Sequence, residues 1–231
     1  MTYNKRIDNR GFDDARPMEA KVGVIKKADG SAMFKIGGTT AIAAVYGPRE
    51  LHPRFMQNPR TGILRCNYNM LPYAADERVR PGPSRRSKEI SMVTKNALLP
   101  VLDLGDYPYT VVDVFIELTE TDAGSRCAGI CAASMALADA GLSMKDMVAS
   151  ISVGKIEDKM VVDLSGEEEH MEENASVDIP IAMIPSTNQV TLLQMDGILS
   201  RDDLMKGLEM AKKPLQKIAE LQRKALLEKY K

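Results

Sequence analysis

The order of apolar periodicities along this chain of 231 residues constrains its fold more than any other feature. Segments with apolar residues at every second position, typical of strands, precede a helical segment, and the same succession returns later in the chain. Strands followed by helices, twice over, predict an α+β fold of two similar β/α halves with mixed sheets packed against helices. We place the first half at residues 1–147 and the second at residues 148–231.

The clearest strand pattern lies between Tyr109 and Glu120, where the alternate apolar residues from Val112 to Leu118 share one face. In the first strand, Val22, Val24 and Ile25 supply the apolar content, and turns are expected at Asp29-Gly30 and Gly37-Gly38. In the first half we expect three strands within 21–48, one near 63–71, a loop over 72–84, a helix over 87–102, a strand over 109–120, a loop over 121–125 and a small-residue helix to 140. In the second half we expect strands over 148–156, 159–164, 178–184 and 189–195, then a helix with Ser200 as its N-cap.

Nothing in the sequence predicts export or a membrane span. The chain starts with a polar, charged segment, and no apolar run approaches the roughly 18 residues of a membrane helix. Three cysteines are too few for a disulfide framework. We therefore expect a cytoplasmic protein without a membrane partner.

Charge is segregated along the chain, although the net charge is only −1. Between Arg49 and Lys88 there are nine Lys or Arg residues against three acids, whereas between Glu157 and Asp178 there are nine acids and one base. Such a chain could hold a polyanion on the first segment and a cation on the second. Two solvated surfaces would give the same pattern.

Two expected helix starts carry residues suited to phosphate. Gly124, Ser125 and Arg126 open one helix, where free backbone N–H groups, a hydroxyl and a guanidinium could bind an anion; simple helix capping is the alternative. Arg85 and Arg86 precede another helix, at the unfavourable positive end of its dipole, so an anion would relieve their repulsion; a solvated surface pair is equally consistent with the sequence.

The acidic segment that ends at Asp178 connects two expected strands, so a sheet should position its carboxylates. Paired carboxylates near phosphate could hold Mg²⁺ or protonate a leaving oxygen, and an acidic loop could also be merely solvated. A phosphate seat, a basic groove and carboxylates together indicate phosphoryl-transfer chemistry on RNA. With only two histidines, a ribonuclease that uses a histidine acid and a histidine base is disfavoured.

Several longer motifs resemble those of the RNase PH family, specifically the catalytic type of subunit in the archaeal exosome, and the resemblance covers nearly the whole chain. The motifs are RIDNRGFDDARP (6–17), GTT (38–40), AAVYGPRE (43–50), YNMLP (68–72), SRRSKEIS (84–91), DAGSR (122–126), DIPIA (178–182) and PSTNQVTLLQ (185–194). The resemblance implies an RNase PH-type fold and a phosphorolytic 3′→5′ exoribonuclease. Inorganic phosphate attacks the 3′-terminal phosphodiester and releases a nucleoside diphosphate, and the reverse reaction extends RNA.

The resemblance also implies roles for particular residues. Gly124, Ser125 and Arg126 would bind the attacking phosphate, and the arginine pair would hold phosphate and the RNA backbone, Arg86 for phosphate and both Arg85 and Arg86 for RNA. Upstream RNA would follow a basic lining that includes Arg54 and Arg65. Such backbone contacts carry little sequence preference.

Asp178 matches the second of two family aspartates near the scissile bond, with a role in catalysis and in binding Mg²⁺ or Mn²⁺. The first aspartate is replaced here. Glu172, six residues before Asp178, is the favoured general acid or metal partner, and Glu169 and Asn174 are the alternatives. Asn174 in that place would put activity itself in doubt.

The resemblance implies partners as well. They are single-stranded RNA, a related inactive RNase PH-like subunit that alternates with this chain in a hetero-hexameric ring, and RNA-binding cap proteins. Two other readings remain open: a stand-alone homohexameric RNase PH that trims tRNA 3′ ends, and a non-catalytic ring subunit that only shapes an RNA channel.

Overall fold

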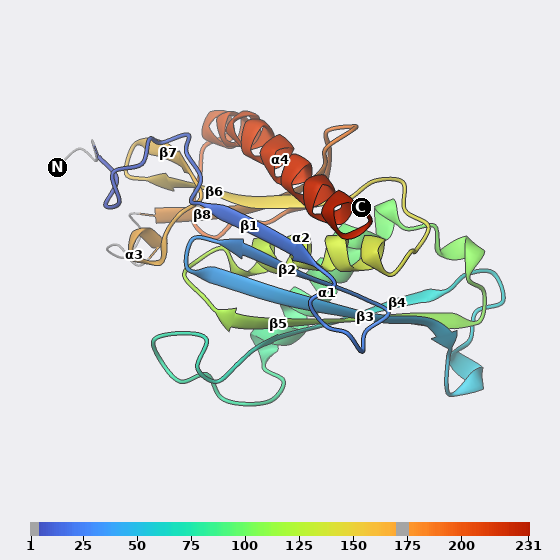
Figure 1. The fold of residues 1–231 in the computed structure, drawn as a ribbon. Coiled ribbons are helices and arrows are strands. Elements are labelled where there is room, and N and C mark those ends of the chain that lie inside the picture. Colours follow the sequence, from blue (N-terminus) through green and yellow to red (C-terminus); the bar gives the residue numbers. More distant parts are fainter. Residues whose placement is uncertain (1–4, 170–175) are drawn as a thin grey trace.

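Two β-sheets with helices between and around them make up the computed structural model, which describes residues 5–169 and 176–231 (Figure 1). The first sheet has the strand order β1-β2-β3-β5-β4, and the second has the order β7-β6-β8-β9. Paired strands are antiparallel except β4 and β5, which are parallel. The strands are β1 (Met18–Val22), β2 (Gly30–Ile36), β3 (Thr39–Glu50), β4 (Ile63–Met70), β5 (Thr110–Glu120), β6 (Ala149–Ile156), β7 (Lys159–Val162), β8 (Ser176–Ile184) and β9 (Gln189–Leu193).

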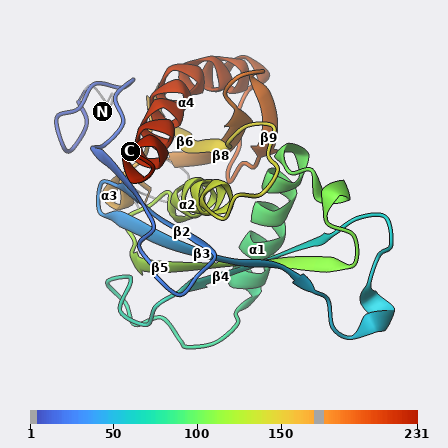
Figure 2. The same ribbon diagram turned by 45° about the vertical axis from the view of Figure 1, so that its right-hand side comes forward.

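Helices separate and cover the sheets. The α-helices are α1 (Arg85–Leu98), α2 (Ser125–Asp139), α3 (Gly166–Glu169) and α4 (Arg201–Lys229), and the short 3₁₀ helices are η1 (Arg54–Met56), η2 (Leu99–Val101) and η3 (Leu104–Asp106). Helix α2 lies between the two sheets, and α4 packs across β6 and reaches β1 (Figure 2). Helix α1 packs against β4 on the same side of the first sheet as α2. The two halves therefore share one hydrophobic core.

The small side chains of α2 explain its central position. Every residue from Cys127 to Leu137 is buried, as expected of a helix that is covered on all sides. A Cβ atom at Gly129 would lie 3.2 Å from Ile116 on β5, and one at Gly30 on β2 would lie 2.3 Å from the carbonyl oxygen of Ala136. The first sheet can approach the helix this closely because these positions carry no side chain.

The structure confirms the α+β class and the order of strands and helices. The turn at Gly37-Gly38 joins β2 to β3, and the alternate residues from Val112 to Leu118 are fully buried on one face of β5. Helix α1 begins at Arg85, two residues before the expected start, because Ser84 caps it and forms a reciprocal capping box with Ser87.

The extent of the first strand is the main error of the sequence-based assignment. Val24 and Ile25 were expected to belong to it, but β1 ends at Val22. Gly23 has a φ of 73°, a left-handed conformation that takes the chain out of the extended form. A second difference is the short helix α3, which lies where a connection without helix was expected. Among the described residues, no helix combines the length and apolar character required to span a bilayer.

Candidate active site

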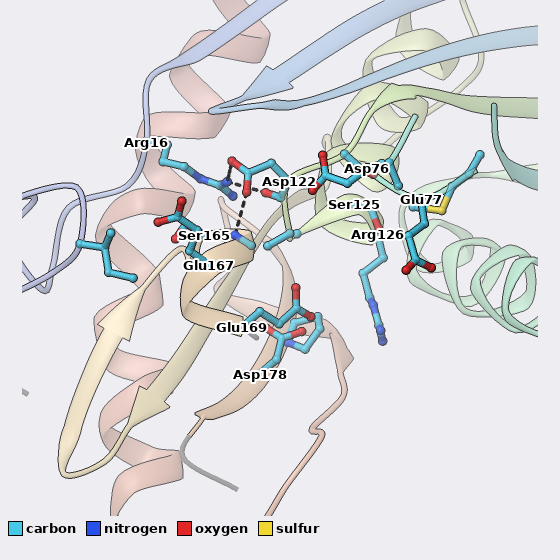
Figure 3. A pocket seen from close by; sticks show the side chains of 18 of the residues that line it. Arg16, Asp76, Glu77, Asp122, Ser125, Arg126, Ser165, Glu167, Glu169 and Asp178 are labelled. Atoms are coloured by element: carbon cyan, nitrogen blue, oxygen red, sulfur yellow. Dashed lines mark hydrogen bonds and ion pairs between the residues drawn. The ribbon is translucent and has the colours of Figure 1, made fainter. Parts of the chain in front are cut away.

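One pocket of about 930 Å³ receives side chains from both halves of the chain (Figure 3). Residues from the loop after β5 and the start of α2 form one wall, and residues from α3 and β8 form the wall opposite. The lining residues are Ile7, Asp8, Arg16, Met70, Ala75, Asp76, Glu77, Arg86, Thr121, Asp122, Ala123, Gly124, Ser125, Arg126, Ser165, Gly166, Glu167, Glu169, Asp178 and Pro180. The pocket therefore joins segments that lie more than a hundred residues apart in the sequence.

The loop between β5 and α2 presents the start of a helix to this pocket. Ala123 and Gly124 both adopt left-handed conformations, with φ of 54° and 62°, which turn the chain sharply into α2. Gly124 is the N-cap residue and has no side chain to bond the first-turn N–H groups. Thr39 braces the loop, because its hydroxyl donates to the carbonyl oxygen of Ala123 at 2.6 Å and accepts from the Asp122 N–H at 2.8 Å. The N–H groups that no side chain caps and the helix dipole favour an anion here.

Arg16 fixes this loop to the second half of the chain. Its guanidinium donates to both carboxylate oxygens of Asp163, at 2.8 and 2.9 Å, and to a carboxylate oxygen of Asp122 at 2.9 Å. The other carboxylate oxygen of Asp122 accepts the backbone N–H of Gly166, at the start of α3, at 2.7 Å. Figure 3 shows the contact between Arg16 and Asp122 beside the pocket. Arg16, Asp122 and Asp163 are called the loop clamp below.

A second arginine anchors the segment that leads into α3. Arg6 and Glu168 form an ion pair of 2.5 Å whose side chains are fully buried. Arg6 also donates to the carbonyl oxygens of Val162 and Asp163, each at 2.7 Å. Because these contacts fix the backbone on both sides of β7's end, they help to place the neighbouring residue Glu169 in the pocket wall.

The carboxyl group of Asp178 enters the pocket from β8. Burial raises the pKa of Asp178 to about 6, and the negative charges of Glu169 and Asp196 add to this effect. A hydrogen bond from the Ser152 hydroxyl and the positive charge of Arg126 act in the opposite direction. Glu169 lies beside Asp178 in the pocket wall (Figure 3). Two carboxyl groups, one of them with a pKa of about 6, therefore face the helix start.

The pocket gathers most of the residues to which the sequence analysis gave a catalytic or phosphate-binding role. Gly124, Ser125, Arg126, Arg86 and Asp178 all line it. The structure therefore brings these five residues together in one pocket, and their roles stay predictions.

Other candidate residues lie elsewhere. Arg85 is the first residue of α1 and is exposed, and it does not line this pocket. Arg54 lies on η1 with 82% of its side chain exposed, 3.7 Å from Glu50. Arg65 lies on the edge strand β4, on the face opposite to the buried Leu64, and donates to Asp113 at 2.7 and 2.9 Å. Glu172 and Asn174 lie outside the described residues, whereas the alternative Glu169 lies in the pocket.

Sequence reasoning gave no role to the loop clamp or to Gln194, which contacts Arg126. Arg16, Asp122 and Gln194 all stand inside the motifs quoted above, so the signal was present, but only packing between the halves shows what they contact. The side chains of Asp76 and Glu77, from the loop before α1, are further pocket residues that the sequence did not single out.

The pocket offers two adjacent carboxylates, Glu169 and Asp178, as ligands for a divalent cation. Among residues 5–169 and 176–231, no group of three or more His, Cys, Asp or Glu residues is placed to hold a metal ion. Glu169 and Asp178 offer two adjacent carboxylates whose mutual repulsion a cation would relieve. Mg²⁺ is commonly held by one or two carboxylates together with water and substrate phosphate oxygens. The donor set therefore suits an ion that binds together with a phosphate-bearing substrate.

Comparison with known proteins identifies relatives over nearly the full length. Residues 14–143 match the family model described as the 3′ exoribonuclease family, domain 1, and residues 146–213 match domain 2 of the same family, the RNase PH models. The exosome complex component Rrp41 of Thermococcus kodakarensis is 50% identical over 226 residues, which cover 98% of this chain and 90% of that protein. The protein of the same name from Methanopyrus kandleri is 48% identical, with 97% and 93% covered.

Solved structures show the same fold. Rice Rrp46 superposes with a TM-score of 0.85 at 23% identity, covering 96% of this chain and all of that chain. A chain of the Archaeoglobus fulgidus exosome, solved with RNA bound to the active site, superposes with a TM-score of 0.78 at 26% identity, covering 99% of this chain and 93% of that chain. Both family models together with the near-complete coverage by relatives at about half identity lead to one conclusion: this chain belongs to the RNase PH family of 3′ exoribonucleases.

Proposed function

We propose that this chain is a phosphorolytic 3′→5′ exoribonuclease subunit of an exosome ring. It releases nucleoside diphosphates from single-stranded RNA and, in the reverse direction, adds nucleotides to RNA 3′ ends. Relatives named as exosome components support the exosome form over a stand-alone enzyme that trims tRNA. The observation that carries the proposal is that the helix start and Arg126 face the Asp178 carboxyl group in the same pocket.

The wall of the pocket formed by the start of α2 binds the attacking phosphate. The N–H groups at the start of α2, the Ser125 hydroxyl and the guanidinium of Arg126 all donate hydrogen bonds, and phosphate only needs acceptor oxygens to use them. Arg86, from the start of α1, adds a second guanidinium to the same pocket. Holding phosphate in line with the scissile phosphorus supplies rate by positioning.

The reaction balances without a further co-reactant. A phosphate oxygen forms a bond to the phosphorus of the last phosphodiester, and the bond from that phosphorus to the 3′ oxygen of the preceding nucleotide breaks. The departing nucleoside diphosphate carries the attacking phosphate, and the 3′ oxygen of the shortened RNA takes up a proton. A carboxyl group delivers this proton, and Glu172, which lies outside the described residues, remains the favoured donor on sequence grounds.

Charge that builds on the phosphoryl oxygens is offset mainly by Arg86 and Arg126. Asp178, with Glu169 or Glu172, would hold Mg²⁺ or Mn²⁺, and such an ion when bound would neutralise part of the same charge. Because Glu169 lies beside Asp178 in the structure, it is the described residue suited to this partnership.

The proposal includes an RNA path and partners. Arg85 is next to Arg86 at the start of α1, so it is placed to contact the RNA backbone near the pocket. Arg54 and Arg65 lie outside the pocket, and only upstream RNA would reach them. The ring would alternate this chain with a related inactive RNase PH-like subunit and carry RNA-binding cap proteins, and we propose the cytoplasm as its location.

The test is phosphate-dependent release of nucleoside diphosphates from 3′-labelled single-stranded RNA, with and without the related ring subunit. Diphosphates should form only when phosphate is present, and Arg126→Glu and Asp178→Ala should abolish them. Arg223→Glu is the matched control, because Arg223 is exposed on α4, away from the pocket, and the change in charge is the same. Its activity should equal that of the wild type.

Two results would contradict the proposal. Release of nucleoside monophosphates without phosphate would identify a hydrolytic enzyme. Absence of any release, even with the ring subunit, would identify a non-catalytic member of the ring.

A further inference from the structure

Arg126 has an unusual partner for an arginine in this protein. Its Nη1 donates to the Oε1 of Gln194 at 2.7 Å, just beyond the end of β9. Among the described residues it has no carboxylate within 4.0 Å, whereas the anchoring arginines Arg6 and Arg16 are each paired with buried carboxylates. The side chain that faces the pocket is therefore held by a neutral acceptor.

The orientation of the Gln194 amide follows from chemistry. A guanidinium has only donors, so the amide must present its oxygen to Arg126 and turn its NH₂ group away. That NH₂ group points to a carboxylate oxygen of Glu89 on α1, at 3.4 Å. The backbone N–H of Gln194 donates to the carbonyl oxygen of Pro180 on β8 at 3.1 Å, which fixes the position of the residue. Gln194 thus connects Arg126 to α1 and to the second sheet.

A neutral acceptor leaves the positive charge of Arg126 in place, whereas a carboxylate would not. Aspartate or glutamate in this place would neutralise most of the positive charge of Arg126 and compete with an incoming anion. An amide oxygen fixes the direction of the guanidinium and leaves its charge in place. The remaining donors of the guanidinium stay available to a tetrahedral anion in the pocket.

We infer that Gln194 is a positioning residue for the attacking phosphate: it holds the Arg126 guanidinium toward the pocket through a neutral contact and so determines the affinity for phosphate. This inference rests on the proposed function, because Arg126 must be a phosphate ligand. Gln194 acts through Arg126 and not by contact with the reacting atoms.

The decisive variant is Gln194→Glu, which keeps the shape of the side chain and adds the neutralising charge. We expect the KM for phosphate to rise by about tenfold, equivalent to about 1.4 kcal/mol, with kcat at saturating phosphate within about twofold of the wild type. Gln194→Leu removes the acceptor without adding charge and should raise the KM for phosphate by roughly threefold. Gln189→Glu, at the exposed start of the same strand, is the matched control and should leave both constants unchanged.

A binding measurement separates this inference from the proposed function. Thermal unfolding of the full chain is followed against the concentration of inorganic phosphate, which reports affinity without turnover. Weaker stabilisation by phosphate in Gln194→Glu than in Gln189→Glu supports the inference, even if no RNA is degraded. Equal stabilisation of both variants, or no stabilisation of the wild type, overturns it. A fall in kcat without a change in the KM for phosphate would also overturn it.

Discussion

Arg16→Met removes the centre of the loop clamp and tests whether buried charge pairing holds the two parts of the site together. Only 6% of the Arg16 side chain and 2% of the Asp163 side chain are exposed, and two hydrogen bonds join them. Methionine keeps the apolar stem and removes the charge, so Asp163 would keep a buried charge, with Arg10 at 3.3 Å as its remaining ion-pair partner among the described residues. Asp122 would lose its ion pair as well and keep its hydrogen bond from the Gly166 N–H.

The expected cost follows from that burial. Removing one member of a buried ion pair costs about 3–5 kcal/mol, and because Arg10 compensates in part we expect about 3 kcal/mol for Arg16→Met. Asp163→Asn added to Arg16→Met removes the orphaned charge. Asparagine also tolerates the left-handed conformation of this residue, whose φ is 55°. The double variant should therefore be more stable than the sum of the single changes predicts, by about 1 kcal/mol or more.

The assay is urea unfolding of the three variants and the wild type at one pH and ionic strength. Lys21→Met is the matched control, since it breaks an ion pair of 2.6 Å between exposed side chains and should leave the free energy of unfolding close to that of the wild type. If Arg16→Met is no more destabilising than Lys21→Met, burial is not the source of the effect. Strictly additive single and double variants would refute the pairing argument. If the clamp also positions the loop between β5 and α2, the KM for phosphate should rise in Arg16→Met under conditions in which this variant is folded.

Three further predictions concern the pocket itself. Burial raises the pKa of Asp178 to about 6 from an ordinary value of 3.8. The ionisation of Asp178 therefore opposes folding above pH 6 and has no effect on stability below pH 4. In EDTA, Asp178→Asn should raise the free energy of unfolding at pH 8 by about 2 kcal/mol. A gain in urea unfolding experiments that does not fade between pH 6 and pH 4 would contradict this assignment. Gly124→Ala should cost about 1 kcal/mol because alanine is strained at a φ of 62°, and calorimetry that finds equal stability would contradict the strain argument. Arg86→Ala should lower kcat/KM in phosphorolysis far more than Arg65→Ala, since only Arg86 lines the pocket, and equal losses in RNA-decay kinetics would show that the pocket does not define the site.

Local patterns in the sequence were sufficient for the fold class and for most elements. The alternation from Val112 to Leu118 predicted a strand with one buried face, and Ser200 predicted the start of the last helix, where its side chain accepts from the N–H of Asp203. These features depend on residues only a few positions apart, so they can be read without knowing what packs against them. The phosphate-binding candidates Gly124 and Arg126 were found in the same way, from one short segment at a helix start.

What the sequence alone determined, then, is which short segments form strands and helices and which of them carry residue types suited to binding phosphate. Only the tertiary structure decided that Asp178 faces Arg126 in one pocket, that Arg65 pairs with Asp113 outside it, and that Arg16 ties the loop between β5 and α2 to the second half. The pKa of Asp178 and the neutral contact of Arg126 also belong to this second group. The physical reason is that burial, pairing of charges and the raised pKa arise from contacts between residues far apart in the chain, and no local pattern specifies which distant side chains will meet.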